Sequence, residues 1–170
     1  MLDALDAVAK GPAGPHSDEL MLFGQFVGHW DVDVRYYPED GPASAHRGEW
    51  SWGWILGGRA IQDVYTVPPR ADQERDGIEP LVHGTTVRIY DPSLVAWRIV
   101  WASPIAGVAL HFVARRRGDE IVLEGSTDDG SLLHWIFSDV GPSSYRWRAV
   151  SSSDGGQSWR TRQDMDVRRK

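Results

Sequence analysis

The segment between residues 48 and 65 reads Gly48-Glu-Trp-Ser-Trp-Gly-Trp-Ile-Leu-Gly-Gly-Arg-Ala-Ile-Gln-Asp-Val-Tyr65. Its tryptophans occupy every second position: Trp50, Trp52 and Trp54. Successive side chains of a β-strand point to opposite faces, so this spacing places the three indoles on one face of a strand. Gly57-Gly58 predicts a hairpin turn. One face of the next strand then carries Ile61, Asp63 and Tyr65. A carboxylate beside an aromatic wall indicates a binding surface rather than a plain core.

Alternating segments continue to the end of the chain and are separated by turn-forming residues such as Asp91-Pro92-Ser93 and Asp128-Asp129-Gly130. They predict strands at 29–37, 46–56, 59–67, 81–90, 94–103, 107–116, 120–127, 131–139, 144–152 and 158–168. Short turns join sequential strands into antiparallel hairpins, and closure into a barrel removes the two edges that an open sheet would expose. We therefore predict an all-β fold, a single up-and-down antiparallel β-barrel of about ten strands.

The chain before this barrel has a helical pattern. Leu2, Leu5, Val8 and Ala9 form a short amphipathic stripe, and Ser17 has the features of an N-cap for a second helix. We expect residues 1–27 to pack on or plug a barrel formed by residues 28–170, as one domain overall. The two longer connections, from Pro38 to Ala45 and from Pro68 to Pro80, are the candidates for loops that guard a cavity.

Composition excludes several classes of function. The 170-residue chain has no cysteine, which rules out disulfides, thiolate catalysis and cysteine zinc sites. Its net charge of −6 argues against a nucleic-acid partner, and Arg115-Arg116-Arg117 and Arg168-Arg169-Lys170 are interpreted as solvated charges. No apolar stretch approaches the ~20 residues of a membrane span, and no signal peptide is visible. These features predict a soluble, cytoplasmic protein.

Phe26-Val-Gly28-His29-Trp30, which opens the first predicted strand, resembles the Gly-x-Trp start of the calycin superfamily, the lipocalins and intracellular fatty-acid-binding proteins. Together with Gly48-Glu49-Trp50 and Gly58-Arg59-Ala60-Ile61-Gln62-Asp63, it resembles uncharacterised bacterial lipocalin-like proteins over about residues 20 to 168. The resemblance implies that Trp30 plugs one barrel end and stacks on a late-strand cation, one of Arg146, Arg148, Arg160 or Arg162. Lipocalins are typically secreted and often disulfide-bonded, so their transport biology is not carried over.

The segment from Ser152 to Trp159 matches the Asp-box pattern of sialidase-type propellers, with Ser158 in place of threonine. Propellers require repeated blades, and the chain shows no repeat at a period of roughly 40 to 50 residues. We therefore interpret this segment as a hairpin turn in which Asp154 bonds the backbone.

The interior of the barrel determines the function. Ten strands favour a ligand cavity over a filled core, although each tryptophan could also simply fill the core or plug an end. We predict binding of a small hydrophobic or aromatic molecule, with Asp63 or an inward arginine fixing its polar end. The predicted ligand-binding residues are Trp50, Trp52, Trp54, Asp63, Tyr65, Arg88, Trp97, Trp101 and Trp147.

An enzyme is the alternative. The same cavity could serve a cyclase, isomerase or hydratase acting on a hydrophobic intermediate, with Asp63 and either His111 or His134 as catalytic acid and base. No spacing typical of a zinc site, phosphate loop or dinucleotide fingerprint occurs, so we predict no metal. No cofactor is predicted, although haem ligated by one of these two histidines is left open.

Overall fold

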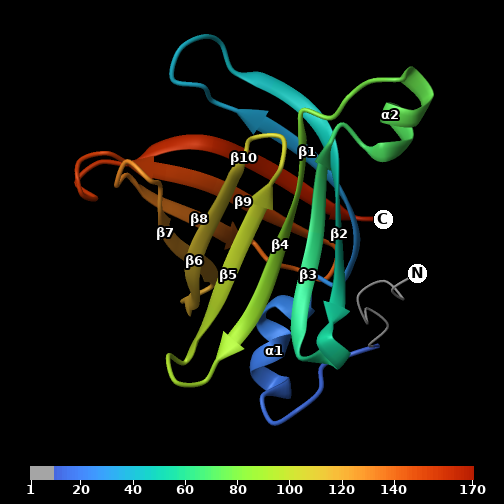
Figure 1. Ribbon diagram of the computed structural model, residues 1–170, viewed down its shortest axis with the longest axis vertical. Coiled ribbons are helices and arrows are strands. Elements are labelled where there is room, and N and C mark those ends of the chain that lie inside the picture. The colour runs from blue at the N-terminus through green and yellow to red at the C-terminus, as the bar shows by residue number, and fades with distance from the viewer. Residues whose placement is uncertain (1–9) are drawn as a thin grey trace.

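The computed structural model describes residues 10–170 as a closed antiparallel barrel with a short helix at each end (Figure 1). The predicted helix at residues 2–9 lies outside the described residues. The helices are α1 (Ser17–Gly24) and α2 (Arg70–Asp76). The strands are β1 (Gly28–Tyr36), β2 (Ser44–Ile55), β3 (Ala60–Val67), β4 (Val82–Asp91), β5 (Ala96–Ser103), β6 (Val108–Arg117), β7 (Glu120–Ser126), β8 (Leu132–Ser138), β9 (Ser144–Ser152) and β10 (Arg160–Arg169).

Every strand pairs with its sequence neighbours, and β1 pairs with β10 to close the barrel. The predicted all-β fold and its ten strands are confirmed. The predicted turn at Gly57-Gly58 is also confirmed, because both glycines have positive φ between β2 and β3. Two local details differ: Ser17 is the first helical residue, preceded by His16 as the N-cap, and the Pro68–Pro80 connection contains the unpredicted α2.

Helix α1 covers one end of the barrel, which we call the closed end (Figure 1). The Phe23 side chain is fully buried and meets the Trp97 ring edge-on at a centroid distance of 5.0 Å. Phe26 packs in the same way on Tyr145 at 4.8 Å, and its carbonyl accepts a 2.7 Å hydrogen bond from the Trp30 indole. Burial of each such ring contributes about 1.5–3 kcal/mol to the stability of the fold. Phe23 in α1 and Phe26 just after it therefore hold this helix on the barrel.

The closed end is completed by the last arginine of β10. The guanidinium of Arg169 lies 4.1 Å from the centre of the Trp30 ring. It also donates hydrogen bonds to the carbonyls of Gln25, Val27 and Pro142. The expectation that Trp30 stacks on one of Arg146, Arg148, Arg160 or Arg162 is therefore wrong. The register of β1 and β10 places Arg169 directly opposite Trp30, so this terminal residue is a structural cation and not a free solvated charge.

The opposite end, which we call the open end, carries the β1–β2 loop and the β3–β4 connection with α2 (Figure 1). The β5–β6, β7–β8 and β9–β10 turns lie at this end as well, because the strands alternate in direction. In the β9–β10 turn, Asp154 accepts hydrogen bonds from the hydroxyls of Ser152 and Ser158 and from the Ser158 amide. The interpretation of the Asp-box segment as a hairpin turn is confirmed.

Candidate functional site

The three tryptophans of β2 lie at three depths inside the barrel. All are buried, with 4–5% of their surface exposed. Trp54 lies at the closed end, where its ring would contact a Cβ added at Gly24 of α1. Trp52 lies one level higher and packs on Phe26 at 5.2 Å. Trp50 is nearest the open end, so the same strand face supplies a plug, a middle layer and a cavity wall.

A cavity of about 220 Å³ occupies the barrel interior towards the open end. Its aromatic lining consists of Tyr36, Trp50, Tyr65, Trp101, Trp135 and Trp147. The remaining lining residues are Leu81, Val82, Thr86, Ser103, Ala106, Gln163 and Met165. The indoles of Trp101, Trp135 and Trp147 meet edge-to-face, with centroid distances of 6.0 Å and 5.4 Å between successive rings. This arrangement offers flat apolar walls to a ligand.

Below the cavity, Asp63 and Arg88 form an ion pair that is closed off from solvent. Arg88 Nη1 donates to Asp63 Oδ2, and the two side chains are 0–1% exposed. The guanidinium also lies over the Trp52 ring at 4.1 Å and over the Phe23 ring at 5.1 Å. The two residues come from β3 and β4, where Asp63 pairs with Thr86 and Arg88 pairs with Ile61. The ion pair therefore joins β3 to β4, and through the contact of Arg88 with Phe23 it also joins these strands to α1 at the closed end.

Burial controls the ionisation of these groups. Burial raises the pKa of Asp63, and the charge of Arg88 together with the approach of Trp50 and Thr86 opposes that rise. Burial also lowers the pKa of Arg88, against the opposing charge of Asp63. The pKa of the Tyr145 hydroxyl is raised well above its ordinary value, first by burial and then by Asp63. A charged pair survives here because each ion is the main partner of the other.

Several polar atoms in this layer lack a hydrogen-bond partner within the described residues. They are Trp50 Nε1, Trp52 Nε1, Asp63 Oδ1, Thr86 Oγ1, Arg88 Nε, Tyr145 Oη and Trp147 Nε1. Buried polar groups in folded proteins are normally paired, and an unpaired one costs about 1–3 kcal/mol. Three of these residues, Trp50, Thr86 and Trp147, also line the cavity. Trp50 and Thr86 both approach Asp63, so Trp147 Nε1 is the donor of a cavity-lining residue that is left without a partner within the described residues.

The structure separates the predicted ligand-binding residues into layers. Trp50, Tyr65, Trp101 and Trp147 line the cavity. Trp52, Asp63 and Arg88 form the layer beneath it, and Trp54 and Trp97 lie at the closed end with α1. Sequence reasoning missed Thr86 and Trp135. Their signals were present, since Thr86 shares the strand face of Arg88, and Trp135 shares that of the buried Phe137.

The two histidines predicted as catalytic residues, His111 and His134, lie outside the barrel. His111 is exposed and pairs across the sheet with the outward Val100. His134 stacks on Trp159 at a centroid distance of 4.1 Å and lies 3.6 Å from a carboxylate oxygen of Glu124. Burial lowers its pKa, against the opposing charge of Glu124. The structure therefore does not bring His111 or His134 together with Asp63, and neither ring faces the cavity. Within residues 10–170, no three histidine or acidic side chains gather as a metal site would require.

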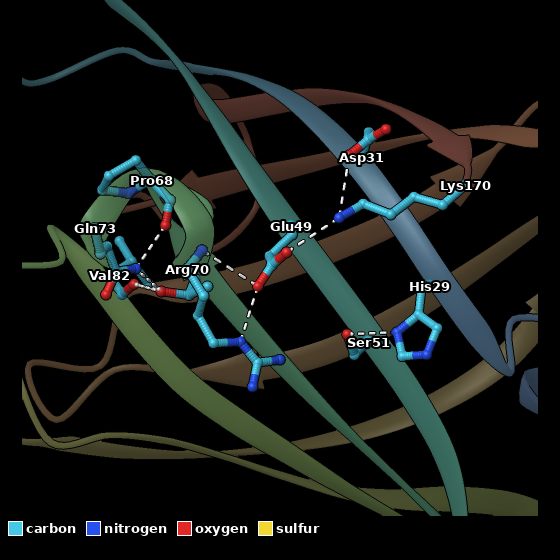
Figure 2. Close-up of polar contacts among 10 residues, drawn as sticks. His29, Asp31, Glu49, Ser51, Pro68, Arg70, Gln73, Val82 and Lys170 are labelled. Atoms are coloured by element: carbon cyan, nitrogen blue, oxygen red, sulfur yellow. Dashed lines mark hydrogen bonds and ion pairs between the residues drawn. The ribbon is translucent and has the colours of Figure 1, made fainter. Parts of the chain in front are cut away.

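An external polar network fixes α2 at the rim of the open end (Figure 2). Glu49 of β2 accepts a 2.8 Å hydrogen bond from Arg70 and a 3.1 Å bond from Lys170. Burial disfavours the charge of Glu49, but these bonds outweigh it and lower the pKa of the carboxyl. Gln73 donates to the Pro68 carbonyl and the Thr66 hydroxyl. These contacts hold the connection that leads into Leu81 and Val82, two residues of the cavity wall.

Neither a protein-family model nor a curated protein sequence matches the chain. Solved structures do share its fold. Rv2717c from M. tuberculosis is 16% identical, with a TM-score of 0.61, covering 92% of this chain and 98% of that one. The S-type phycobiliprotein lyase CPES from Guillardia theta is 11% identical, with a TM-score of 0.58, covering 88% of this chain and 91% of that one. At these identities the likeness concerns the fold alone.

Neither helix in the described part of the chain has the length and apolar character that crossing a membrane requires.

Proposed function

We propose that this protein binds a small hydrophobic or aromatic molecule in the cavity at the open end of its barrel. The observation that carries the proposal is the combination of an aromatic cavity wall with an indole N–H of that wall, Trp147 Nε1, that has no partner within the described residues. Ligand sites are typically apolar clefts with a few such polar groups that orient the molecule. A bound acceptor atom would satisfy this donor.

The dimensions of the cavity narrow the choice of ligand. Its volume of about 220 Å³ is below the roughly 300–1,000 Å³ of pockets that hold drug-sized molecules. A flat molecule of one or two rings suits this volume and the edge-to-face indoles around it. Because the wall includes the unpartnered Trp147 N–H, we expect the ligand to present an oxygen acceptor to it.

The test is a titration of two-ring aromatic alcohols, ketones and acids against the purified protein. Calorimetry measures binding directly, and tryptophan fluorescence reports whether the indoles are contacted. We expect saturable binding that Trp147→Phe weakens, because phenylalanine keeps an apolar ring but removes the N–H donor. The expected loss is about 1 kcal/mol, or roughly fivefold in Kd, for one hydrogen bond.

Trp54→Phe is the matched control. It makes the same substitution at another buried tryptophan, on β2 and at the closed end, where the ring contacts α1. It should leave the Kd unchanged. Equal effects of the two variants, or no saturable binding by any member of the series, would contradict the proposal.

A further inference from the structure

A second hollow adjoins the cavity at the open end. It is a groove of about 400 Å³, bounded by the β7–β8 turn, the β9–β10 turn and the β1–β2 loop. Its lining is mostly polar and includes Ser131, Ser151, Ser153, Arg160 and Arg162. In contrast to the indole cavity, this groove offers hydroxyls and guanidinium groups.

The groove and the cavity share the inward surface of the barrel. Leu133 lines the groove and Trp135 lines the cavity, and they occupy alternate positions of β8. On β10, Arg162 lines the groove, and its neighbour Gln163 lines the cavity. A molecule seated among the indoles therefore has the groove beside it at the rim.

An irregularity in β10 directs Arg160 towards this rim. Arg160 pairs with Ser151 and Gln163 pairs with Ala149, so the register shifts between Thr161 and Gln163. Residues three positions apart would face opposite sides of a regular strand, but one extra residue on the bulged strand returns both to the same side. Ser151 and Ala149 alternate with the buried Trp147 on the inner face of β9. The bulge thus places Arg160 on the inner side together with Gln163.

The charge of Arg160 is not neutralised by the part of the chain that the structure describes. Its Nη2 donates to the Pro38 carbonyl, and within residues 10–170 no carboxylate oxygen lies in ion-pair range. The two acidic residues of the groove are engaged by groove residues other than Arg160. Glu39 lies 3.8 Å from Arg162, and Asp129 accepts hydrogen bonds from Thr127 and from the Ser131 amide. A guanidinium has five N–H donors in a planar fork that fits an oxyanion.

We propose that the ligand carries an oxyanion, a carboxylate or a phosphate, which Arg160 binds at the rim while the aromatic body occupies the cavity. This inference rests on the proposed function and specifies its ligand class as an aromatic acid. Arg160 supplies the charge, and the hydroxyls of Ser151 and Ser153 lie in the same groove. The neutral analogue of such a ligand retains the cavity contacts and loses the contact at the rim.

The experiment compares matched pairs of probes by calorimetry on the full chain. The probes are 2-naphthyl carboxylic acids with tethers of one to five methylenes, their uncharged primary amides, and the corresponding phosphonates. We expect one tether length at which the acid binds about three- to fivefold more tightly than its amide, as for a partly exposed ion pair. This preference should fall as salt is raised. A stronger preference for the phosphonate would identify phosphate as the natural group, and the opposite order would identify a carboxylate.

Arg160→Gln should abolish the preference for the acid and leave the affinity for the amide unchanged. Arg59→Gln is the control, because it removes the same charge from an exposed position in the turn at the closed end. Binding of acids and amides with equal affinity at every tether length would overturn the oxyanion site while leaving the proposed function intact. Failure of both to bind would overturn the two together.

Discussion

Replacing Asp63 with asparagine isolates the contribution of the buried ion pair. The change keeps the shape of the side chain but leaves the Arg88 guanidinium charged, 1% exposed and enclosed by the rings of Trp52 and Phe23. Removing one partner of a buried pair costs about 3–5 kcal/mol, because the remaining charge is uncompensated. A protein of this length has a total stability of about 5–15 kcal/mol, so Asp63→Asn should remove a large fraction of it.

Urea unfolding followed by tryptophan fluorescence measures this loss, and thermal unfolding checks it. For chains of about 150–250 residues, 1 kcal/mol corresponds to roughly 2–4 °C in Tm, so a decrease of about 6–20 °C is expected. The control is Asp33→Asn, which breaks the exposed pair with Arg168 and should cost less than about 1 kcal/mol.

A double variant separates the charge from the packing. Asp63→Leu combined with Arg88→Met removes both ions and should recover most of the stability lost in Asp63→Asn, since an apolar pair avoids the cost of burying charge. The reasoning is refuted if Asp63→Asn costs no more than Asp33→Asn. It is also refuted if the double variant loses as much free energy of unfolding as the sum of the losses measured for the two single substitutions.

Three further outcomes are expected. Gly84→Ala should lower the free energy of unfolding by about 1–3 kcal/mol and weaken ligand binding, because the added Cβ would meet the Trp101 ring and lie 2.8 Å from the Ala102 carbonyl. In the control Gly53→Ala no atom lies within 4 Å of the added Cβ, so chemical unfolding should show an unchanged or higher free energy of unfolding. Arg169→Gln should lower the stability by about 2 kcal/mol and change the emission of Trp30, whereas a shift no larger than that of Arg168→Gln would argue against a structural cation. Hydrogen bonds from Ser93 and then Arg98 lower the pKa of Asp91 to about 2. The contribution of this carboxylate to stability is therefore present above its unfolded pKa of about 3.9 and is lost as pH falls towards 2. The Tm values of the wild type and Asp91→Asn should accordingly converge at acid pH.

The strands and the inward faces of β2 and β3 could be predicted because alternation and turn chemistry are local properties. Parity identifies the side of a strand, but not the height of a residue along the barrel axis. For this reason alternation assigns Trp50, Trp52 and Trp54 to one wall. In the structure their rings contact three different sets of residues: the cavity lining, Arg88 and α1. Height depends on register between strands and on α1, which closes one end through tertiary contacts.

The later strands were less accessible to sequence reasoning for a different reason. The bulge at Arg162 changes the parity of β10, so alternation counted from Met165 assigns Arg160 to the wrong face. The partner of Trp30 could not be selected among the arginines because its proximity depends on closure between the first and last strands. Asp63 and Arg88 were each predicted from the sequence as ligand-binding residues, but their ion pair depends on the register of β3 and β4.

Closure of β1 onto β10 also has a consequence for the order of assembly during synthesis. The ion pair between Arg35 and Asp164 lies across this seam and joins residues 129 positions apart in the sequence. The ribosome therefore releases nearly the whole sheet before the last strand can join the first, and until then both edges remain unpaired. Contacts between such distant residues slow folding, so the nascent chain exposes its indoles to solvent for longer than a chain of local contacts would. A ligand or a chaperone present during synthesis could reach the interior laterally, a route that the finished barrel closes.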